Sequence, residues 1–427
     1  MSEHFDGESP AGSFDAALTV PDAPARGASS PGLLARIAKA RLIEALPQLA
    51  VGRLTIHLPD GATHQGGDPD SALHATMWID DEAFFGAFAS RGDIGVGESW
   101  MAGHFRTDDL VALLEIGIRN EAALPQVSWL TRLLNVGNDL RHRLRPNTRA
   151  GSRRNIHAHY DLSNALFSLF LDPAMVYSSA YYERADDTLA EAQQQKFRRL
   201  AEAVGLHRGA HVLEIGCGWG GFAIFAARTY GCRVTGITVS EEQFELATAR
   251  VREAGLQGQV DIRFCDYRDV DGQYSHIVSI EMLEAVGREH WQTFFEVCHA
   301  RLAPGGALAI QTIGMPDHRF ETYARHADWI QKYIFPGGML PSVGAMVDAA
   351  STTTPLTLRW IDDIAPHYAR TLREWRVQFL DRLDEVRALG FDDRFVRMWV
   401  YYLASCEAMF STRQISTLQL VMARAGE

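Results

Sequence analysis

The residues best suited to chemistry follow a short apolar stretch, Val212 to Ile215. They read Gly216-Cys217-Gly218-Trp219-Gly220-Gly221 and lead directly into a helical pattern. Glycines at such a junction allow a tight turn and let a ligand approach the backbone at the end of a strand. The G-x-G-x-G spacing differs from the G-x-G-x-x-G of nicotinamide enzymes. Glu214, two residues before the first glycine, suits the positively charged methionyl end of a sulfonium cofactor and would repel a pyrophosphate.

Two later stretches support an adenosyl ligand. A nicotinamide site needs an acid at the end of its second strand. This chain instead has Thr238 there, followed by Ser240 and Gln243, and Asp266-Tyr267 follows the third strand, where an acid and a ring could bracket an adenine. We therefore expect S-adenosylmethionine to be held by Glu214, Gly216, Gly218, Thr238, Gln243, Asp266 and Tyr267.

The elements that must position these residues alternate between strands and helices. The pattern predicts strands at 212–215, 233–238, 262–265, 276–280 and 307–312, with helices at 222–229 and 241–253. This alternation is typical of an α/β fold with a mostly parallel sheet and helices on both faces. A strand at 53–58 among helical patterns predicts a smaller α+β domain, which precedes the α/β domain in the chain. We expect a disordered leader at 1–30, that N-terminal domain at 31–140, a basic linker at 141–155 and the cofactor domain at 156–427.

Composition narrows the class of protein. No apolar run approaches the roughly 18 residues that span a bilayer, and no secretory signal is evident, so a cytoplasmic enzyme is expected. The five cysteines are scattered, which argues against a disulfide framework or a metal site. The formal net charge of −12 disfavours nonspecific binding to nucleic acid or to an anionic membrane. One stretch reverses that charge, with Arg141, Arg143, Arg145, Arg149, Arg153 and Arg154 and no acid among them.

Beyond the glycine motif, several segments resemble the cyclopropane-fatty-acyl-phospholipid synthase family, including its mycolic acid relatives. The resemblance covers about residues 150 to 415. Its segments are His159-Tyr160-Asp161-Leu162-Ser163-Asn164, Tyr177-Ser178-Ser179-Ala180-Tyr181, Gly236-Ile237-Thr238-Val239-Ser240, Ser279-Ile280-Glu281-Met282-Leu283-Glu284-Ala285-Val286-Gly287, Gln311-Thr312-Ile313, Tyr333-Ile334-Phe335-Pro336-Gly337-Gly338 and Tyr368-Ala369-Arg370-Thr371-Leu372. The resemblance implies a Rossmann-like class I methyltransferase, and it adds Tyr177 and Ser178 to the cofactor residues.

The resemblance also implies a reaction. Family members methylate a cis double bond of a phospholipid acyl chain, and a base then removes a proton from the new methyl group as a cyclopropane closes. In that family a bound bicarbonate is the proposed base. The matching positions here are Glu284, Tyr368 and the backbone of Ile313, whereas Ser179 and Gln311 replace a Cys and a His. Ser and Gln can donate hydrogen bonds to an anion but bring no positive charge, so the use of bicarbonate stays open.

Two glutamates, Glu281 and Glu284, lie three residues apart just after a strand. At the start of a helix the dipole alone would favour acids. Beside the cofactor sulfur, they could instead stabilise a cation or accept its proton. We favour that second role for Glu284 and leave Glu281 open.

The expected partner is an unsaturated phospholipid in a membrane. Basic groups near anionic headgroups contribute about 1 kcal/mol each, so the arginine-rich linker would hold the enzyme at the inner face of the membrane. The apolar segment from Trp329 to Leu340 is expected to line a lipid-binding insertion, although such segments more often form core. Cyclopropane formation is the leading hypothesis. A methylene or methyl-branched chain without ring closure is the alternative, and a small-molecule methyltransferase is a third. The oligomeric state, a homo-oligomer included, stays open.

Overall fold

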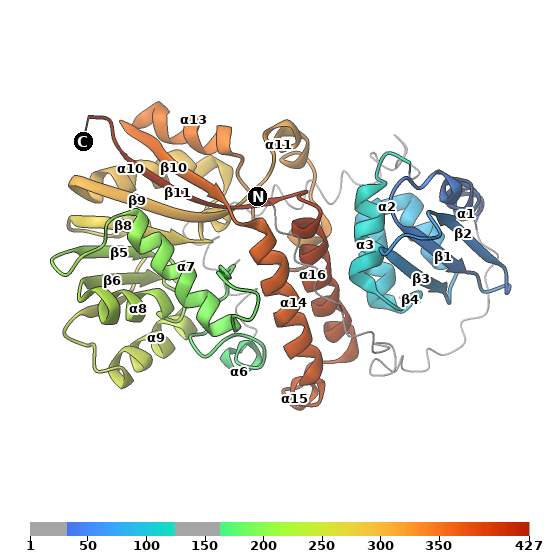
Figure 1. The fold of residues 1–427 in the computed structure, drawn as a ribbon, viewed down its shortest axis with the longest axis horizontal. Coiled ribbons are helices and arrows are strands. Elements are labelled where there is room, and N and C mark those ends of the chain that lie inside the picture. The colour runs from blue at the N-terminus through green and yellow to red at the C-terminus, as the bar shows by residue number, and fades with distance from the viewer. Residues whose placement is uncertain (1–31, 124–162, 427) are drawn as a thin grey trace. The chain divides into compact units, whose positions relative to one another are not determined.

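The computed structural model describes residues 32–123 and 163–426, and its contacts divide the chain into two units (Figure 1). The first unit comprises residues 1–140 and 380–412, and the second comprises 141–379 and 413–427. The expected leader at 1–30 and the basic linker at 141–155 lie outside the described residues. No helix within the described ranges is both long and apolar enough to cross a membrane.

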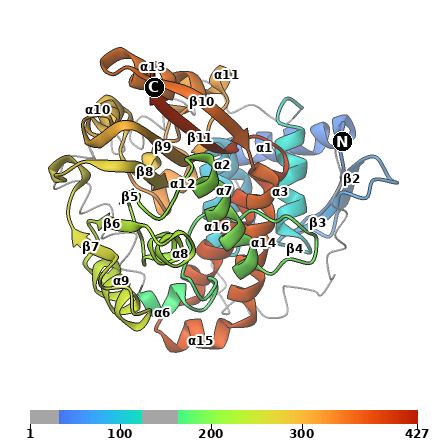
Figure 2. The same cartoon turned by 60° about the vertical axis from the view of Figure 1, so that its left-hand side comes forward.

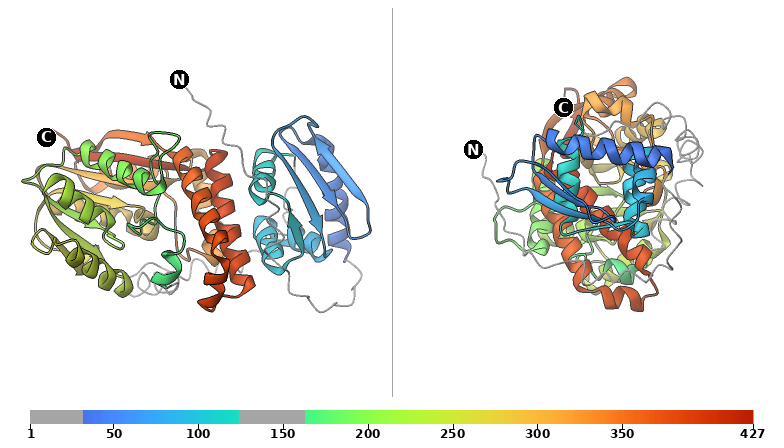
Figure 3. Two further views of the ribbon diagram at one scale, coloured as in Figure 1. Left: turned by 60° about the horizontal axis from the view of Figure 1, so that its bottom comes forward. Right: turned by 90° about the vertical axis from the view of Figure 1, so that its right-hand side faces the viewer.

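The first unit is a small α+β assembly around a four-stranded sheet (Figure 3). The strand order is β2-β1-β3-β4, with β1 antiparallel to β2 and parallel to β3. Alternate residues of β1 and β3 are buried, as expected for a sheet with one face on a core. Its elements are α1 (Leu33–Ala45), β1 (Arg53–His57), β2 (Thr63–Gly67), β3 (His74–Ile79), α2 (Ala83–Ala102), β4 (Phe105–Thr107), α3 (Leu110–Arg119), α15 (Leu383–Ala388) and α16 (Asp393–Ser411).

The late helix α16 completes this first unit by packing on α2 and α3. The buried Arg397 guanidinium donates from Nε to the Trp100 carbonyl at 2.8 Å, and the Trp100 indole donates to the Arg397 carbonyl at 2.9 Å. Because a buried guanidinium needs such acceptors, this reciprocal pair fixes where α16 lies in the unit. The stretch expected as one domain at 156–427 is therefore interrupted by residues 380–412, which group with the N-terminal residues.

The second unit is built on a seven-stranded sheet of order β10-β11-β9-β8-β5-β6-β7. The strands from β9 to β7 run parallel, and β11 pairs antiparallel with both β9 and β10. The strands are β5 (His211–Ile215), β6 (Arg233–Thr238), β7 (Val260–Phe264), β8 (Tyr274–Ile280), β9 (Leu302–Gly314), β10 (Leu356–Asp363) and β11 (Ser416–Arg424). Its helices are α6 (Asn164–Phe167), α7 (Leu189–Ala203), α8 (Gly221–Tyr230), α9 (Glu241–Glu253), α10 (Trp291–Arg301), α11 (Asp317–Tyr323), α12 (Trp329–Tyr333), α13 (Val343–Thr353) and α14 (Ala365–Asp381), whose last residues pass into the first unit.

Apolar side chains pack against both faces of this sheet. Helices lie on both sides of it (Figure 2), which confirms the expected α/β layering. Val212 of β5 packs with residues of α7 and α8, and its neighbour Leu213 packs on the opposite face with residues of α10 and α13. The chain leaves β5 toward β6 on one side and returns to β8 on the other, so the strand order reverses at β5. Ligands of open α/β sheets bind beyond the carboxyl ends of the strands at such a point.

Candidate active site

A cavity lies at the carboxyl ends of β5, β6 and β8, where the strand order reverses. Every residue expected to hold the cofactor lines it: Tyr177, Ser178, Glu214, Gly216, Gly218, Thr238, Gln243, Asp266 and Tyr267. These residues come from four separated stretches of sequence, which the parallel sheet brings to one edge.

The glycine turn after β5 lines this cavity. Gly216 and Gly218 have φ angles of 81° and 52°, which L side chains rarely adopt. A Cβ on Gly216 would lie 2.7 Å from Cγ of Met282, so the turn also needs glycine for space. The backbone N–H groups of Gly216 and Cys217 both donate to the Ile237 carbonyl at 3.0 Å, which ties the turn to β6.

Glu214 gives this cavity a buried acid. Its pKa is raised well above the usual value because burial penalises the charged form, with the positive charge of Lys196 opposing that rise. Its Oε2 is buried and has no hydrogen-bond partner among the described residues. A buried acceptor without a hydrogen-bond partner fits an ammonium group, so the site suits the methionyl end of S-adenosylmethionine.

The polar groups expected for the adenosyl end also line the cavity. The Thr238 hydroxyl donates to Oε1 of Gln243 at 2.8 Å, which joins the end of β6 to α9. Asp266 is bound by Arg268, whose NH2 donates to Oδ2 at 2.6 Å. The sequence reasoning missed Arg268, which also lines the cavity, because a single arginine in a loop carries no signal by itself. The Asp266 carboxylate therefore holds its own loop in place.

Glu281 directly follows β8 and lines the same cavity. Its Oε1 accepts hydrogen bonds from the Ser179 backbone N–H and from Nε2 of Gln311, both at 2.8 Å. Its Oε2 accepts one from the Tyr368 hydroxyl at 2.7 Å. Burial raises the pKa of Glu281, while the charge of Lys196 and these three hydrogen bonds oppose the rise. Three of the expected catalytic positions, on three different segments, thus converge on this glutamate.

Glu284 lies in a short 3₁₀ turn, Leu283–Ala285, instead of the expected helix start. Its Oε1 accepts from the Ile313 backbone N–H at 2.5 Å and from the Thr312 hydroxyl at 2.9 Å. Burial and then the nearby charge of Glu281 raise its pKa to about 8. Its Oε2 has no hydrogen-bond partner in the part of the chain that the structure describes.

A fully buried lysine on α7, Lys196, balances part of this negative charge. Its Nζ donates to the Ser178 hydroxyl at 2.7 Å. Burial lowers its pKa to about 8, and the charges of Glu281, Asp172 and Glu214 work against that fall. Sequence reasoning missed Lys196, since a lysine in a polar helical stretch is usually exposed.

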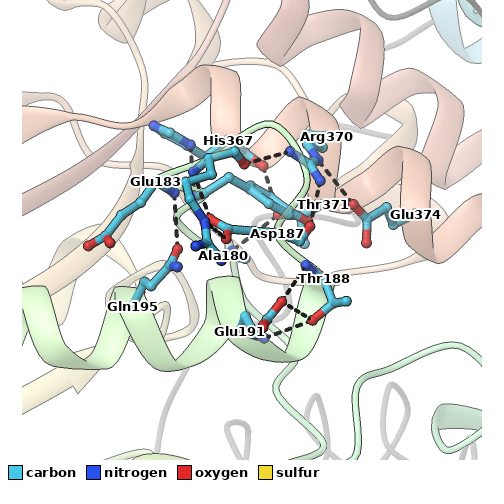
Figure 4. A network of polar contacts seen from close by, with 12 residues as sticks. Ala180, Glu183, Asp187, Thr188, Glu191, Gln195, His367, Arg370, Thr371 and Glu374 are labelled. Atoms are coloured by element: carbon cyan, nitrogen blue, oxygen red, sulfur yellow. Dashed lines mark hydrogen bonds and ion pairs between the residues drawn. The ribbon is translucent and has the colours of Figure 1, made fainter.

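The segment from Ser179 to Thr188 is fastened between α14 and α7 (Figure 4). The Ala180 N–H donates to the Thr371 hydroxyl at 3.1 Å, and the Arg370 guanidinium donates to the Asp187 carbonyl at 2.6 Å. On the other side, the Glu183 N–H donates to the Gln195 side chain at 3.0 Å, and Thr188 and Glu191 form a capping box at the start of α7. These contacts hold Ser179 and Tyr368 against Glu281.

The amide of Gln311 is oriented by a residue from the end of the chain. Gln419 on β11 donates from Nε2 to Oε1 of Gln311 at 2.9 Å. This leaves Nε2 of Gln311 facing Glu281, with a second contact to the Ser179 carbonyl at 3.2 Å. Gln311 therefore acts as a donor toward the carboxylate.

Comparisons with known proteins identify the family of this chain. The family model described as mycolic acid cyclopropane synthetase matches residues 147–420. Tuberculostearic acid methyltransferase UfaA1 of Mycobacterium tuberculosis is 40% identical over 390 residues, which span 88% of this chain and 90% of that protein. Cyclopropane-fatty-acyl-phospholipid synthase of Escherichia coli (strain K12) is 36% identical over 360 residues, 83% and 89% of the two lengths.

A solved structure matches the second unit's fold. Mycolic acid cyclopropane synthase CmaA1, complexed with SAH and CTAB, is 32% identical with a TM-score of 0.59 over 63% of this chain and 97% of that one. The family model covers well over half of the chain, and the relatives align along most of both lengths. The chain is therefore an S-adenosylmethionine-dependent methyltransferase that belongs to the mycolic acid cyclopropane synthetase family.

Proposed function

We propose that this enzyme methylates a cis double bond in an acyl chain of an unsaturated phospholipid, at a membrane surface. The observation that carries the proposal is the carboxylate of Glu281, which faces the cofactor cavity and accepts hydrogen bonds from three segments. A fixed negative charge there would stabilise positive charge that develops on a hydrocarbon chain. The names of the relatives, which refer to phospholipid, mycolic acid and tuberculostearic acid, support a lipid substrate.

S-Adenosylmethionine, when bound, supplies a methyl group that the alkene π electrons take up as the sulfur–carbon bond breaks. Glu214 and the glycine turn would hold the methionyl part, and Tyr267 and Gln243 the adenosyl part. One positive charge is then left on the acyl chain beside Glu281. A carboxylate can take a proton from that chain, and the carbon–hydrogen electron pair becomes a new carbon–carbon bond.

Two products can follow from that proton transfer. Loss of a proton from the new methyl group with ring closure gives a cyclopropane, which the family model and the Escherichia coli relative support. If hydride migrates along the chain first, proton loss gives a methylene or methyl-branched alkene. Hydrogen bonds to the ionised form make a carboxylate a weaker base. Glu281 accepts three, but its burial has the larger effect and raises its pKa overall, so Glu281 can serve as the base for either product.

The experiment uses the full chain, methyl-labelled S-adenosylmethionine and vesicles of a vaccenoyl phospholipid. We expect label in the acyl chains, and mass spectrometry should show the added carbon. Proton NMR then separates the products, because cyclopropane protons appear at high field and vinyl protons at low field. Matched vesicles of a saturated phospholipid are the control and should take up no label. An unlabelled lipid fraction, with label instead on an added small molecule, would overturn the proposal.

A further inference from the structure

The donors that the family resemblance assigns to bicarbonate already donate hydrogen bonds to acceptors within this protein. The Ser179 N–H and the Gln311 amide donate to Oε1 of Glu281, and the Tyr368 hydroxyl donates to its Oε2. The Ile313 N–H donates to Oε1 of Glu284. The Ser179 hydroxyl donates to the Ala180 carbonyl at 2.9 Å. Each expected donor thus has an acceptor without any added anion.

The charges nearby also argue against an extra anion. Glu281 and Glu284 are both buried, and the charge of Glu281 already raises the pKa of Glu284. A bicarbonate beside the Glu281 carboxylate would add a second negative charge at low dielectric, where like charges repel strongly. The residues of this site therefore do not fit bicarbonate.

The backbone of Glu281 indicates that its position is specifically maintained. Its φ angle is 49°, in the left-handed region that a glutamate rarely adopts. Its N–H donates to the Gln311 carbonyl at 2.7 Å, which holds that conformation at the end of β8. Strained residues of this kind persist where the surroundings over-determine them, commonly at functional sites. Here the result is a carboxylate aimed at the three donors.

We propose that the Glu281 carboxylate is the resident anion of this active site and takes the place of bicarbonate, so that the reaction needs no added anion. This inference rests on the proposed function, since it names the group that faces the charged acyl chain. Glu281 takes up the proton that the chain loses, the carbon–hydrogen electron pair stays with carbon, and the proton then passes to water. Tyr368, Gln311 and the Ser179 N–H hold the carboxylate in place.

The first test uses the wild-type enzyme in buffer stripped of carbon dioxide. Label transfer from S-adenosylmethionine to vaccenoyl phospholipid is measured with and without added bicarbonate, at constant ionic strength set with chloride. We expect equal turnover. A saturable rise with bicarbonate would overturn the inference while leaving the proposed function intact, whereas no label in lipid under either condition would overturn the proposed function itself.

The second test empties the carboxylate position. Glu281→Gly suits the positive φ and leaves the three donors unpaired, whereas Glu281→Gln keeps the position filled with a neutral group. We expect both variants to lose turnover by about 100-fold or more, the usual effect of removing a general base. Bicarbonate or formate should restore turnover in Glu281→Gly only.

Thermal unfolding without cofactor or lipid gives a readout independent of activity. Added bicarbonate should raise the Tm of Glu281→Gly and leave the wild type and Glu281→Gln unchanged, relative to equal chloride. Wild-type turnover in Glu281→Gly without an anion would overturn the inference. A folded Glu281→Gly that shows neither rescue nor a Tm shift would also overturn it, because the freed donors would then not form an anion site.

Discussion

At the scale of single residues, Glu281 and Glu284 differ in how many hydrogen bonds and opposite charges stabilise each carboxylate. Glu281 accepts three hydrogen bonds and has the charge of Lys196 nearby, whereas Glu284 has one oxygen without a partner in the described residues. Burial and the charge of Glu281 therefore raise the pKa of Glu284 to about 8. Glu284 should thus be protonated at neutral pH, and its role would be to adjust the basicity of Glu281.

This difference predicts the pH dependence of turnover. As the pH rises through about 8, Glu284 ionises, and its new charge should make Glu281 a stronger base and further stabilise a cation. Turnover should therefore rise with a midpoint near pH 8. Lys196 titrates in the same range, so the wild-type profile alone combines two groups. The measurement is the ratio of wild-type to Glu284→Gln turnover from pH 6 to 9.5, which should grow with pH. A constant ratio would contradict the assigned role.

The same pKa shift predicts how stability depends on pH. The pKa of Glu284 lies near 8 in the folded chain and near 4.5 in the unfolded chain, so the folded chain binds more protons between those values. The contribution of Glu284 to the free energy of unfolding should therefore fall as the pH rises from about 4.5 to 8. Urea unfolding of the wild type and Glu284→Gln at pH 5 and pH 8.5 measures this. Relative to the wild type, the free energy of unfolding of Glu284→Gln should be higher at pH 8.5 than at pH 5. The same difference in free energy of unfolding at both pH values would argue against a buried, protonated Glu284.

At the scale of the element, the sequence predicted regular segments better than it predicted side-chain environments. The bounds of β6 and α9 match the expected 233–238 and 241–253, because apolar periodicity runs through both segments. The roles of Glu281 and Lys196 in the site could not be predicted from apolar periodicity. Their roles depend on burial and on partners such as Ser179 and Tyr368 that are far away in sequence. The grouping of residues 380–412 with the N-terminal residues could not be predicted either, because it depends on contacts between segments that are far apart in sequence.

The attachment of the segment from Ser179 to Thr188 to α14 makes its own prediction. Thr371→Val removes the acceptor of the buried Ala180 N–H, which should cost about 1–3 kcal/mol and loosen Ser179 against Glu281. We expect a lower Tm together with reduced turnover. Thr248→Val in α9 is the matched control, because the Thr248 hydroxyl donates to the Phe244 carbonyl of its own helix. An equal loss of turnover in both variants would show that the attachment has no specific effect on the site.

At the scale of the whole molecule, the chain builds the first unit, then the second, and returns to the first at residue 380. Folding of the first unit therefore depends on α16, which is far in sequence from α1, α2 and α3. Replacing Arg397 by Met keeps most of the apolar stem but leaves the carbonyls of Trp100 and Phe105 without this donor. The expected loss is about 1–3 kcal/mol in that unit. Arg359→Met, at an exposed arginine on β10, is the control for loss of charge. Hydrogen exchange should quicken together in α2, β4 and α16 of Arg397→Met, with β5 and β8 protected as before, because local stability follows cooperative units. Faster exchange confined to α16 would instead mean that residues 380–412 do not fold as part of the first unit.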